Sequence, residues 1–187
     1  MDWTIPGTVL KGKREDARNI PDQFGAMFLG GGMMLSQVAA VTGLEHHTIQ
    51  NWVRRGYLTA PVGKKYTLRQ LCRLLNISLL KSVLTIEQSC SLLQYVNGSL
   101  DDYSDDLIDD AHLYFTFVYL AANIQELYNT QDREAFLENA LAQYQEPVPG
   151  GKERVKNALR IMLTAYLAQK MHTAAERMIA QITSKGE

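Results

Sequence analysis

The chain has 187 residues, two cysteines, 46% hydrophobic residues and a formal net charge of -1, enough for one domain or for two small domains that share a core. This composition excludes global disorder and a disulfide framework, so we interpret Cys72 and Cys90 as buried thiols in a reducing compartment. The longest strongly apolar run, residues 113–122, is about half of the ~20 residues that a membrane span needs, and the first residues lack the layout of a signal peptide. We therefore expect a cytoplasmic protein with no membrane partner.

The charges are strongly segregated along the chain. Residues 36–81 hold seven basic residues and one acidic residue, whereas residues 82–146 hold twelve acidic residues and one basic residue. Residues 147–187 are basic again, with seven bases and three acids. Because screening limits the reach of a charge to about 8–10 Å at physiological salt, local charge decides where a polyanion binds. Residues 36–81 are the candidate surface for a polyanion.

Residues 1–34 are rich in glycine and proline and end in three consecutive glycines, so we expect an irregular N-terminal arm with at most one short helical turn. A phosphate-binding loop is disfavoured, because no Gly-Lys-Ser/Thr follows these glycines. Ser36 is a good N-cap, and Gly43 ends the short helix that it begins. A second helix over residues 45–55 ends at Gly56.

The next segment, residues 57–66, is too short and too marked by proline and glycine for a helix, and it predicts two short strands around a turn. A longer helix is expected from Thr67 to about residue 80. Thr85 with Gln88 forms a capping-box pattern for the next helix, which should stop at residues 97–98. We therefore expect one domain over residues 35–97.

Residues 98–187 predict a helical domain that serves packing, dimerisation or effector binding. Its acidic start at residues 101–110 is expected to begin a helix that carries two stripes of aspartates, either solvated or paired with Lys and Arg. The apolar residues that follow predict a buried central helix, in which the aromatic side chains form core or a ligand pocket. A short helix over residues 132–144 and a long amphipathic helix from Lys152 complete the domain.

The acidic stretch at residues 101–110 has two further interpretations. A calcium loop is disfavoured, because the stretch lacks the glycine and the terminal glutamate of an EF-hand. A regulatory alternative is that its aspartates compete with DNA for the basic segment.

The helix over residues 45–55 carries the candidate binding site. If Ile49, Trp52 and Val53 face the core, then His47, Asn51 and Arg54 form one outward stripe, with Gln50 beside it. Asn and Gln can pair with adenine and Arg with guanine, and paired lysines at a strand turn suit phosphate contacts. The predicted DNA-binding residues are His47, Gln50, Asn51, Arg54, Arg55, Lys64, Lys65 and Tyr66.

Residues 35–96 resemble the winged-helix DNA-binding domain of MerR-type transcription regulators. The shared features are a Thr-Gly turn at residues 42–43, Thr-Ile at residues 48–49, a Gly-hydrophobic-Leu exit at residues 56–58, a basic-Tyr-Thr wing end at residues 65–67 and the helix start at residues 84–87. Residues 48–71 together with the aspartate-rich stretch are similar to a MerR-like bacterial family catalogued as a domain of unknown function. The resemblance implies an all-α fold with a small β-hairpin wing, that is, a winged helix-turn-helix followed by a C-terminal helical domain.

The resemblance also implies a non-enzymatic, sequence-specific transcription regulator that binds double-stranded DNA. Because one such DNA-binding domain makes a small interface, we expect a homodimer on a two-fold site. An unknown small-molecule effector is the partner expected if the aromatic residues of the helical domain form a ligand pocket. The recognition helix, residues 45–55, would enter the major groove, and the wing, residues 57–66, would contact the backbone. No cofactor is expected. The family's long dimerisation helix is interrupted here by residues 97–98.

Several of these residues also have a purely structural interpretation. His46 and His47 are too isolated from other ligands for a metal site, and either a solvated helix start or DNA contact accounts for them. Trp52 suits the core better than base stacking, and Arg54 or Arg55 could simply interact with the helix dipole. At the level of function, the alternatives are a protein-interaction module that keeps the fold without binding DNA, and a ligand-sensing domain over residues 98–187.

Overall fold

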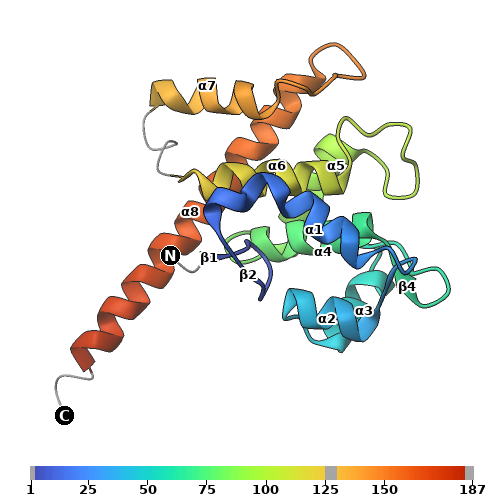
Figure 1. Cartoon of the computed structure of the whole chain (residues 1–187), viewed down its shortest axis with the longest axis horizontal. Coiled ribbons are helices and arrows are strands. Elements are labelled where there is room, and N and C mark those ends of the chain that lie inside the picture. Colours follow the sequence, from blue (N-terminus) through green and yellow to red (C-terminus); the bar gives the residue numbers. More distant parts are fainter. Residues whose placement is uncertain (1–2, 125–129, 184–187) are drawn as a thin grey trace.

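The computed structural model describes residues 3–124 and 130–183, and in these residues the chain is mostly helical with two small two-stranded sheets. In chain order (Figure 1), the elements are β1 (Trp3–Thr4), β2 (Lys11–Gly12), the 3-10 helix η1 (Arg14–Asn19), α1 (Ile20–Met27), β3 (Met33–Met34), α2 (Leu35–Thr42), α3 (His46–Arg54), β4 (Lys65–Tyr66), α4 (Leu68–Leu80), α5 (Ile86–Asn97), α6 (Asp110–Ala122), α7 (Thr130–Ala140) and α8 (Gly151–Thr183). Within the described ranges, every helix is too short or too polar to cross a bilayer.

Helix α4 lies at the centre of the molecule and begins where the sequence predicts. The Thr67 hydroxyl accepts a hydrogen bond from the Gln70 amide at 3.2 Å, and the Gln70 side chain accepts one from the Thr67 amide at 2.8 Å. Leu71, Leu74 and their apolar neighbours are buried against α2, α5, α6 and α8. The apolar positions of α4 occur all round the helix, which is typical of a core helix.

Helices α5 and α6 also confirm their predicted character. Thr85 caps α5 as expected, and Gly98 ends it with φ +61°. Tyr114 and Phe117 of α6 are fully buried, and the Tyr114 hydroxyl donates to the Pro6 carbonyl at 2.8 Å. The aromatic side chains of α6 therefore belong largely to the core.

The prediction of an irregular arm over residues 1–34 is wrong for residues 14–27, which form η1 and α1. Ile20 and Phe24 are four residues apart, so they share one face of the helix, and both are buried. The Phe24 ring lies 6.0 Å from that of Tyr114 and 5.5 Å from that of Phe115, measured between centroids. Burial of this face stabilises the helix, although the glycine and proline content of the segment predicts an irregular arm.

The predicted two-stranded hairpin within residues 57–66 is also wrong in its pairing. The only regular strand there is β4, and its antiparallel partner is β3, with Met33 opposite Tyr66 and Met34 opposite Lys65. The turn itself is tight, because Gly63 and Lys64 both have positive φ and an isolated bridge joins Val62 to Lys65. The strands approach closely at Gly32, where a Cβ atom would lie 2.9 Å from the Tyr66 carbonyl oxygen.

The acidic loop (residues 98–109) contains no helix, so the two predicted helical stripes of aspartates do not form. The Asp102 carboxylate accepts a hydrogen bond from the Ser104 amide at 2.9 Å. Asp109 caps α6 instead, by accepting hydrogen bonds from the amides of Ala111 and His112. Short Asp side chains compete for backbone amides in this way, and they favour turns and caps over helix interiors.

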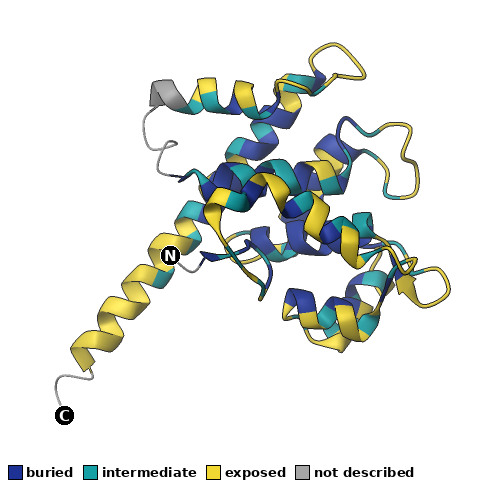
Figure 2. Cartoon of the chain, in the orientation of Figure 1, coloured by how far each residue is buried: buried dark blue, intermediate teal, exposed yellow. Residues whose placement is uncertain are grey.

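The C-terminal helices pack as an ion-paired couple. Lys156 lies 2.7 Å from Glu138 and Arg160 lies 2.6 Å from Glu134, which joins α8 to α7. One face of the first half of α8 is buried, whereas the residues of its second half are nearly all exposed (Figure 2). Buried side chains from residues 3–166 form one hydrophobic cluster, so the segments predicted as separate domains share a single core.

Candidate nucleic-acid interface

Helices α2 and α3 are joined by a short turn that Gly43 makes possible. Gly43 caps α2 with φ +69°, and a Cβ atom there would lie 2.7 Å from Val9 Cγ1. The Thr42 hydroxyl donates to the Val38 carbonyl at 2.8 Å and accepts from the Leu44 amide at 3.2 Å. These bonds satisfy backbone groups at the turn and fix the direction in which α3 leaves α2.

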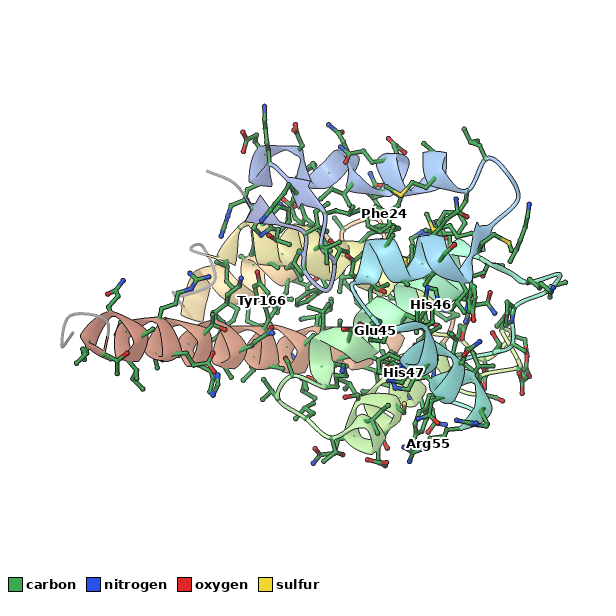
Figure 3. The ribbon with its side chains drawn as sticks, turned by 90° about the horizontal axis from the view of Figure 1, so that it is seen from below. Phe24, Glu45, His46, His47, Arg55 and Tyr166 are labelled. Carbon is green, nitrogen blue, oxygen red and sulfur yellow. The ribbon has the colours of Figure 1, made fainter. Side chains whose placement is uncertain are left out.

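Helix α3 has a buried face and an exposed face, as its spacing predicts. Ile49 and Trp52 are buried, and Val53 is half-buried against the same core. His47, Gln50 and Arg54 are exposed. Figure 3 shows Glu45, His46 and His47 together at the start of the helix and Arg55 at its far end. The exposed face can therefore reach a partner while Trp52 belongs to the core.

Asn51 is half-buried, and its side-chain oxygen accepts a hydrogen bond from Arg54 Nη2 at 3.0 Å. The bond joins two of the predicted recognition residues on one stripe of α3. It uses the acceptor of Asn51 and leaves its amide hydrogens available, and Arg54 retains most of its donors.

Arg55 is tied to the body of the protein. Its guanidinium lies 3.3 Å from Glu87 on α5 and stacks 4.8 Å from the centroid of the Tyr57 ring. The Tyr57 hydroxyl also donates to Glu87, at 3.2 Å. Both members of this ion pair are about half exposed or more, so the pair is weak and a phosphate could displace Glu87.

The wing tip, residues 63–65, presents two lysines but not the tyrosine predicted with them. Lys64 and Lys65 are exposed, and Lys65 Nζ donates to the Gly30 carbonyl at 2.8 Å. Tyr66 is only 3% exposed, because successive residues of a strand point to opposite faces and Lys65 takes the outer one. The structure thus places the Tyr66 ring largely in the core, and its contact with DNA stays a prediction.

A groove of about 400 Å³ separates α3 from the wing tip. Gln50 and Val53 of α3 line one side, and Lys64 lines the other. Met34, Leu35, Pro61 and Tyr66 form the rest of its lining. The sequence missed the contribution of Met34, because the pairing of β3 with β4 joins residues about thirty positions apart, and no local pattern signals such a contact.

Comparison with known proteins places this region in a family. Residues 32–130, more than half of the chain, match the family described as a domain of unknown function, DUF1836. The chain belongs to the DUF1836 family. It is also 25% identical over 160 residues to the uncharacterized protein YkrK of Bacillus subtilis (strain 168), an alignment that covers 79% of this chain and 69% of YkrK. No solved structure matches the chain.

The DUF1836 region includes the acidic loop, and the structure shows what that loop binds. Asp106 lies 2.5 Å from Arg69, and the next helix begins with Asp110, which lies 3.4 Å from Arg73. Burial raises the pKa of Asp110 above its ordinary value, although Arg73 and Arg69 act in the opposite direction. Among the described residues, these aspartates thus neutralise bases of α4 rather than those of α3 or the wing tip.

The acidic loop therefore does not occlude the exposed face of α3. Arg69 and Arg73 account for two of the seven bases in residues 36–81, and Arg55 has a partner in Glu87. Four bases remain for a polyanion: Arg54, Lys64 and Lys65 lie on α3 and the wing tip, whereas Lys81 lies just after α4, 5.6 Å from the centroid of the Trp52 ring. The histidines of α3 are exposed, and the described residues contain no cluster of His, Cys, Asp and Glu suited to a metal ion.

Proposed function

We propose that this protein is a sequence-specific DNA-binding transcription regulator whose residues 33–97, here called the headpiece, act as a MerR-like winged helix-turn-helix. In this proposal α2 and α3 form the helix-turn-helix, and the wing is the β4 turn supported by β3. Helix α3 inserts into the major groove, and the protein catalyses no reaction.

The observation that carries the proposal is the position of Lys64 across one groove from Gln50. The exposed face of α3 and the wing tip therefore point to the same side of the molecule. A B-DNA major groove admits one α-helix, and a loop beside that helix then meets the sugar-phosphate backbone.

The side chains of α3 have the chemistry to read bases. The Gln50 amide can make two hydrogen bonds to adenine, and Arg54 can make two to guanine. Asn51 holds Arg54 through the 3.0 Å hydrogen bond, which limits the conformations of the guanidinium before DNA arrives. We expect Asn51 to act largely as a positioning residue, and His47 to contact a phosphate or a base edge from the first turn.

Lys64, Lys65 and Arg55 would supply the phosphate contacts. Each phosphate neutralised by Lys or Arg releases counterions, so affinity falls with salt by a slope of about 0.9 per contact. Such contacts fix the register of the protein on DNA without reading sequence. Because few Lys and Arg side chains are free to contact phosphates, we expect modest non-specific affinity. Binding should then depend strongly on contacts between α3 and the DNA bases.

Two DNA experiments test the proposal. Selection of bound fragments from a genomic library, followed by fluorescence titration at several salt concentrations, should give a preferred sequence and a salt slope. Lys64→Ala with Lys65→Ala should reduce that slope by about 1.8 and weaken all sequences alike. Gln50→Ala should weaken the preferred site by about 1–3 kcal/mol while leaving non-specific binding nearly unchanged. Arg54→Ala should cost a similar amount at the preferred site and should also weaken non-specific binding, because it removes a charge.

Lys13→Ala is the matched control, because Lys13 is also exposed but lies on the N-terminal segment. Its salt slope should equal that of the unchanged protein. Failure to bind any fragment at about 50 mM salt would overturn the proposal, as would an unaltered slope in the double lysine variant. Capture of a protein partner in the absence of DNA binding would instead support an interaction module with the same fold.

We further propose that the regulator binds DNA as a homodimer on a two-fold site. One recognition helix and one wing make a small interface with few base contacts, and two headpieces double it. A symmetric dimer requires two half-sites related by the same two-fold axis, so the selected sequence should be an inverted repeat.

A cavity of about 720 Å³ favours effector control as a second function of the same chain. It lies between the acidic loop, α6 and the end of α7, and it is lined by Arg69, Tyr103, Asp106, Asp109, His112 and Tyr144 among others. Because Arg69 belongs to α4, a bound molecule would touch the headpiece and the helical half together. A metabolite that raises the Tm and alters DNA affinity would support this function; stabilisation without any change in DNA affinity would count against it.

A further inference from the structure

The outer half of α8 carries large apolar side chains that nothing in the described chain covers. Up to Tyr166 the helix is packed on the body, but the residues beyond Leu167 project away from it (Figures 1 and 2). Met171 and Ile182 are each 74% exposed, and Met178 is 63% exposed. Monomeric proteins rarely leave contiguous apolar surface of this kind in water.

These side chains follow a heptad pattern. The first series, spaced seven residues apart, is Ile161, Ala168, Ala175 and Ile182. The second series, three residues after the first three members, is Thr164, Met171 and Met178. The set, which we call the seam, is Ile161, Thr164, Ala168, Met171, Ala175, Met178 and Ile182. Apolar and small residues at alternating intervals of three and four over three heptads are the pattern of a coiled-coil contact.

The seam lies on the open side of the helix. At 3.6 residues per turn it falls nearly opposite to Val155, Leu159, Met162 and Tyr166, which pack on the body. Ile161, at 44%, is exposed even where the helix is attached, and Thr164 is exposed beside it. The Thr164 hydroxyl already donates to the Arg160 carbonyl at 2.8 Å, so covering it leaves no unpaired donor.

We propose that the seam binds the seam of a second copy of this chain, with the two helices antiparallel. In an antiparallel pair, each residue of the first heptad series faces one of the second series. One register sets Ala168 against Met178, Ala175 against Met171, and Thr164 against Ile182, and the two-fold axis repeats each contact. Each of these layers joins one large and one small side chain, which fills space evenly, and Ile161 lies just beyond the last layer.

The other arrangements pack less well. In a parallel pair, Ala168 and Ala175 would each face their own copy, and the Ala–Ala layers would leave gaps next to crowded Met–Met layers. Shifting the antiparallel register by one heptad places Ala175 against Thr164, which leaves a similar gap. Because unfilled space forfeits contact energy, the size pattern selects the antiparallel register.

Charge also permits the pairing of two copies. The charged residues Lys170, Glu176 and Arg177 lie on the face of the helix away from the seam, so association brings no like charges into direct contact. His172 lies closer to the edge and forms an ion pair with Glu176 at 3.6 Å. From Thr164 to Ile182 the contact would extend about 28 Å at 1.5 Å per residue.

Sedimentation equilibrium of the full chain without DNA tests the pairing. We expect a dimer at micromolar concentration, and Met171→Glu with Met178→Glu should weaken the dimer at least 100-fold. The control is Gln169→Glu with Ala180→Glu, which adds the same charge to the opposite face and should leave the dimer intact. A monomer at all concentrations, or a dimer unaffected by the seam variant, would overturn the proposal.

Cross-linking tests the orientation. Mixed Thr164→Cys and Ile182→Cys chains of different size should form the mixed disulfide, whereas links between identical chains would contradict the antiparallel register. The seam contact does not depend on DNA binding. A monomeric protein that still recognises DNA would therefore contradict only the proposed dimer contact. A dimeric protein that binds no DNA would contradict only the proposed role as a regulator.

Discussion

At the residue scale, the best predicted features are those that a few neighbouring side chains determine. Thr67, Thr85, Gly43 and Gly98 end or begin helices as expected, because capping depends on side chains within three or four residues. The two lysines before Tyr66 do not reveal that its ring is buried. Its neighbour Lys65 points outward, and the alternation of a strand then places Tyr66 inside.

The buried pairing of Asp110 with Arg73 yields a stability prediction. The side chains of both residues are at most 5% exposed, so Asp110→Ala would leave a guanidinium without its counter-charge. Breaking such a pair costs about 3–5 kcal/mol, whereas replacing both partners by apolar residues is often nearly neutral. Urea unfolding should show this loss for Asp110→Ala and a substantial recovery in Asp110→Leu with Arg73→Met.

Asp101→Ala is the matched control, because Asp101 is an exposed aspartate of the acidic loop. Its unfolding midpoint should stay close to that of the unchanged protein. If Asp110→Ala were equally harmless, the Arg73 charge would have to be satisfied by other groups, and the pair would not be a structural link between α4 and α6.

At the element scale, what the sequence predicts depends on how local each contact is. Helices α4 and α6 are predicted from their dense apolar content and α5 from its capping box. Helix α3 shows its inner and outer faces through the spacing of Ile49, Trp52 and Val53. Strand pairing does not follow such rules, since β3 joins β4 across a long sequence separation. The predicted helix over the acidic loop does not form, because its aspartates accept hydrogen bonds from nearby backbone amides. The spacing of residues along a helix does not take this competition into account.

The contact between α7 and α8 should depend on pH. Hydrogen bonds from Lys152 and Lys156 lower the pKa of Glu138 from 4.5 to about 2. A carboxyl whose pKa is lower in the folded protein stabilises it above the unfolded pKa, and this contribution disappears as pH falls from about 4.5 to about 2. Glu138→Gln removes it at every pH.

Thermal unfolding of both proteins between pH 7 and pH 2 measures this effect. The Tm of Glu138→Gln should be lower at pH 7, and the difference should shrink as the pH falls below about 4.5. Because Glu138 is exposed, we expect a small difference. A difference that stays constant with pH would show that the substitution acts through packing rather than through charge.

At the scale of the whole molecule, the acidic and basic segments seen in the sequence pair partly with each other and are only partly available to a partner. Asp106 and Asp110 pair with Arg69 and Arg73 of α4, and the acids of α7 pair with bases of α8, so a part of the opposing charge meets within the chain. What remains outside is the groove between α3 and the wing tip at one end and the seam at the other. The DUF1836 match covers the groove but ends at residue 130, before the seam.

Removing residues 168–187 should separate these two surfaces. Residues 168–183 are outside the buried core, so the shortened chain should fold with nearly the same Tm. It would lose most of the seam and become monomeric. Two linked headpieces gain about 10²–10⁴-fold in avidity over one, so affinity for a two-fold site should fall by at least about 100-fold while affinity for a half-site stays unchanged. Fluorescence anisotropy with the two DNA lengths distinguishes the cases: an equal loss on both would mean that the removed residues contact DNA themselves, and no loss on either would mean that the headpieces bind independently of the seam.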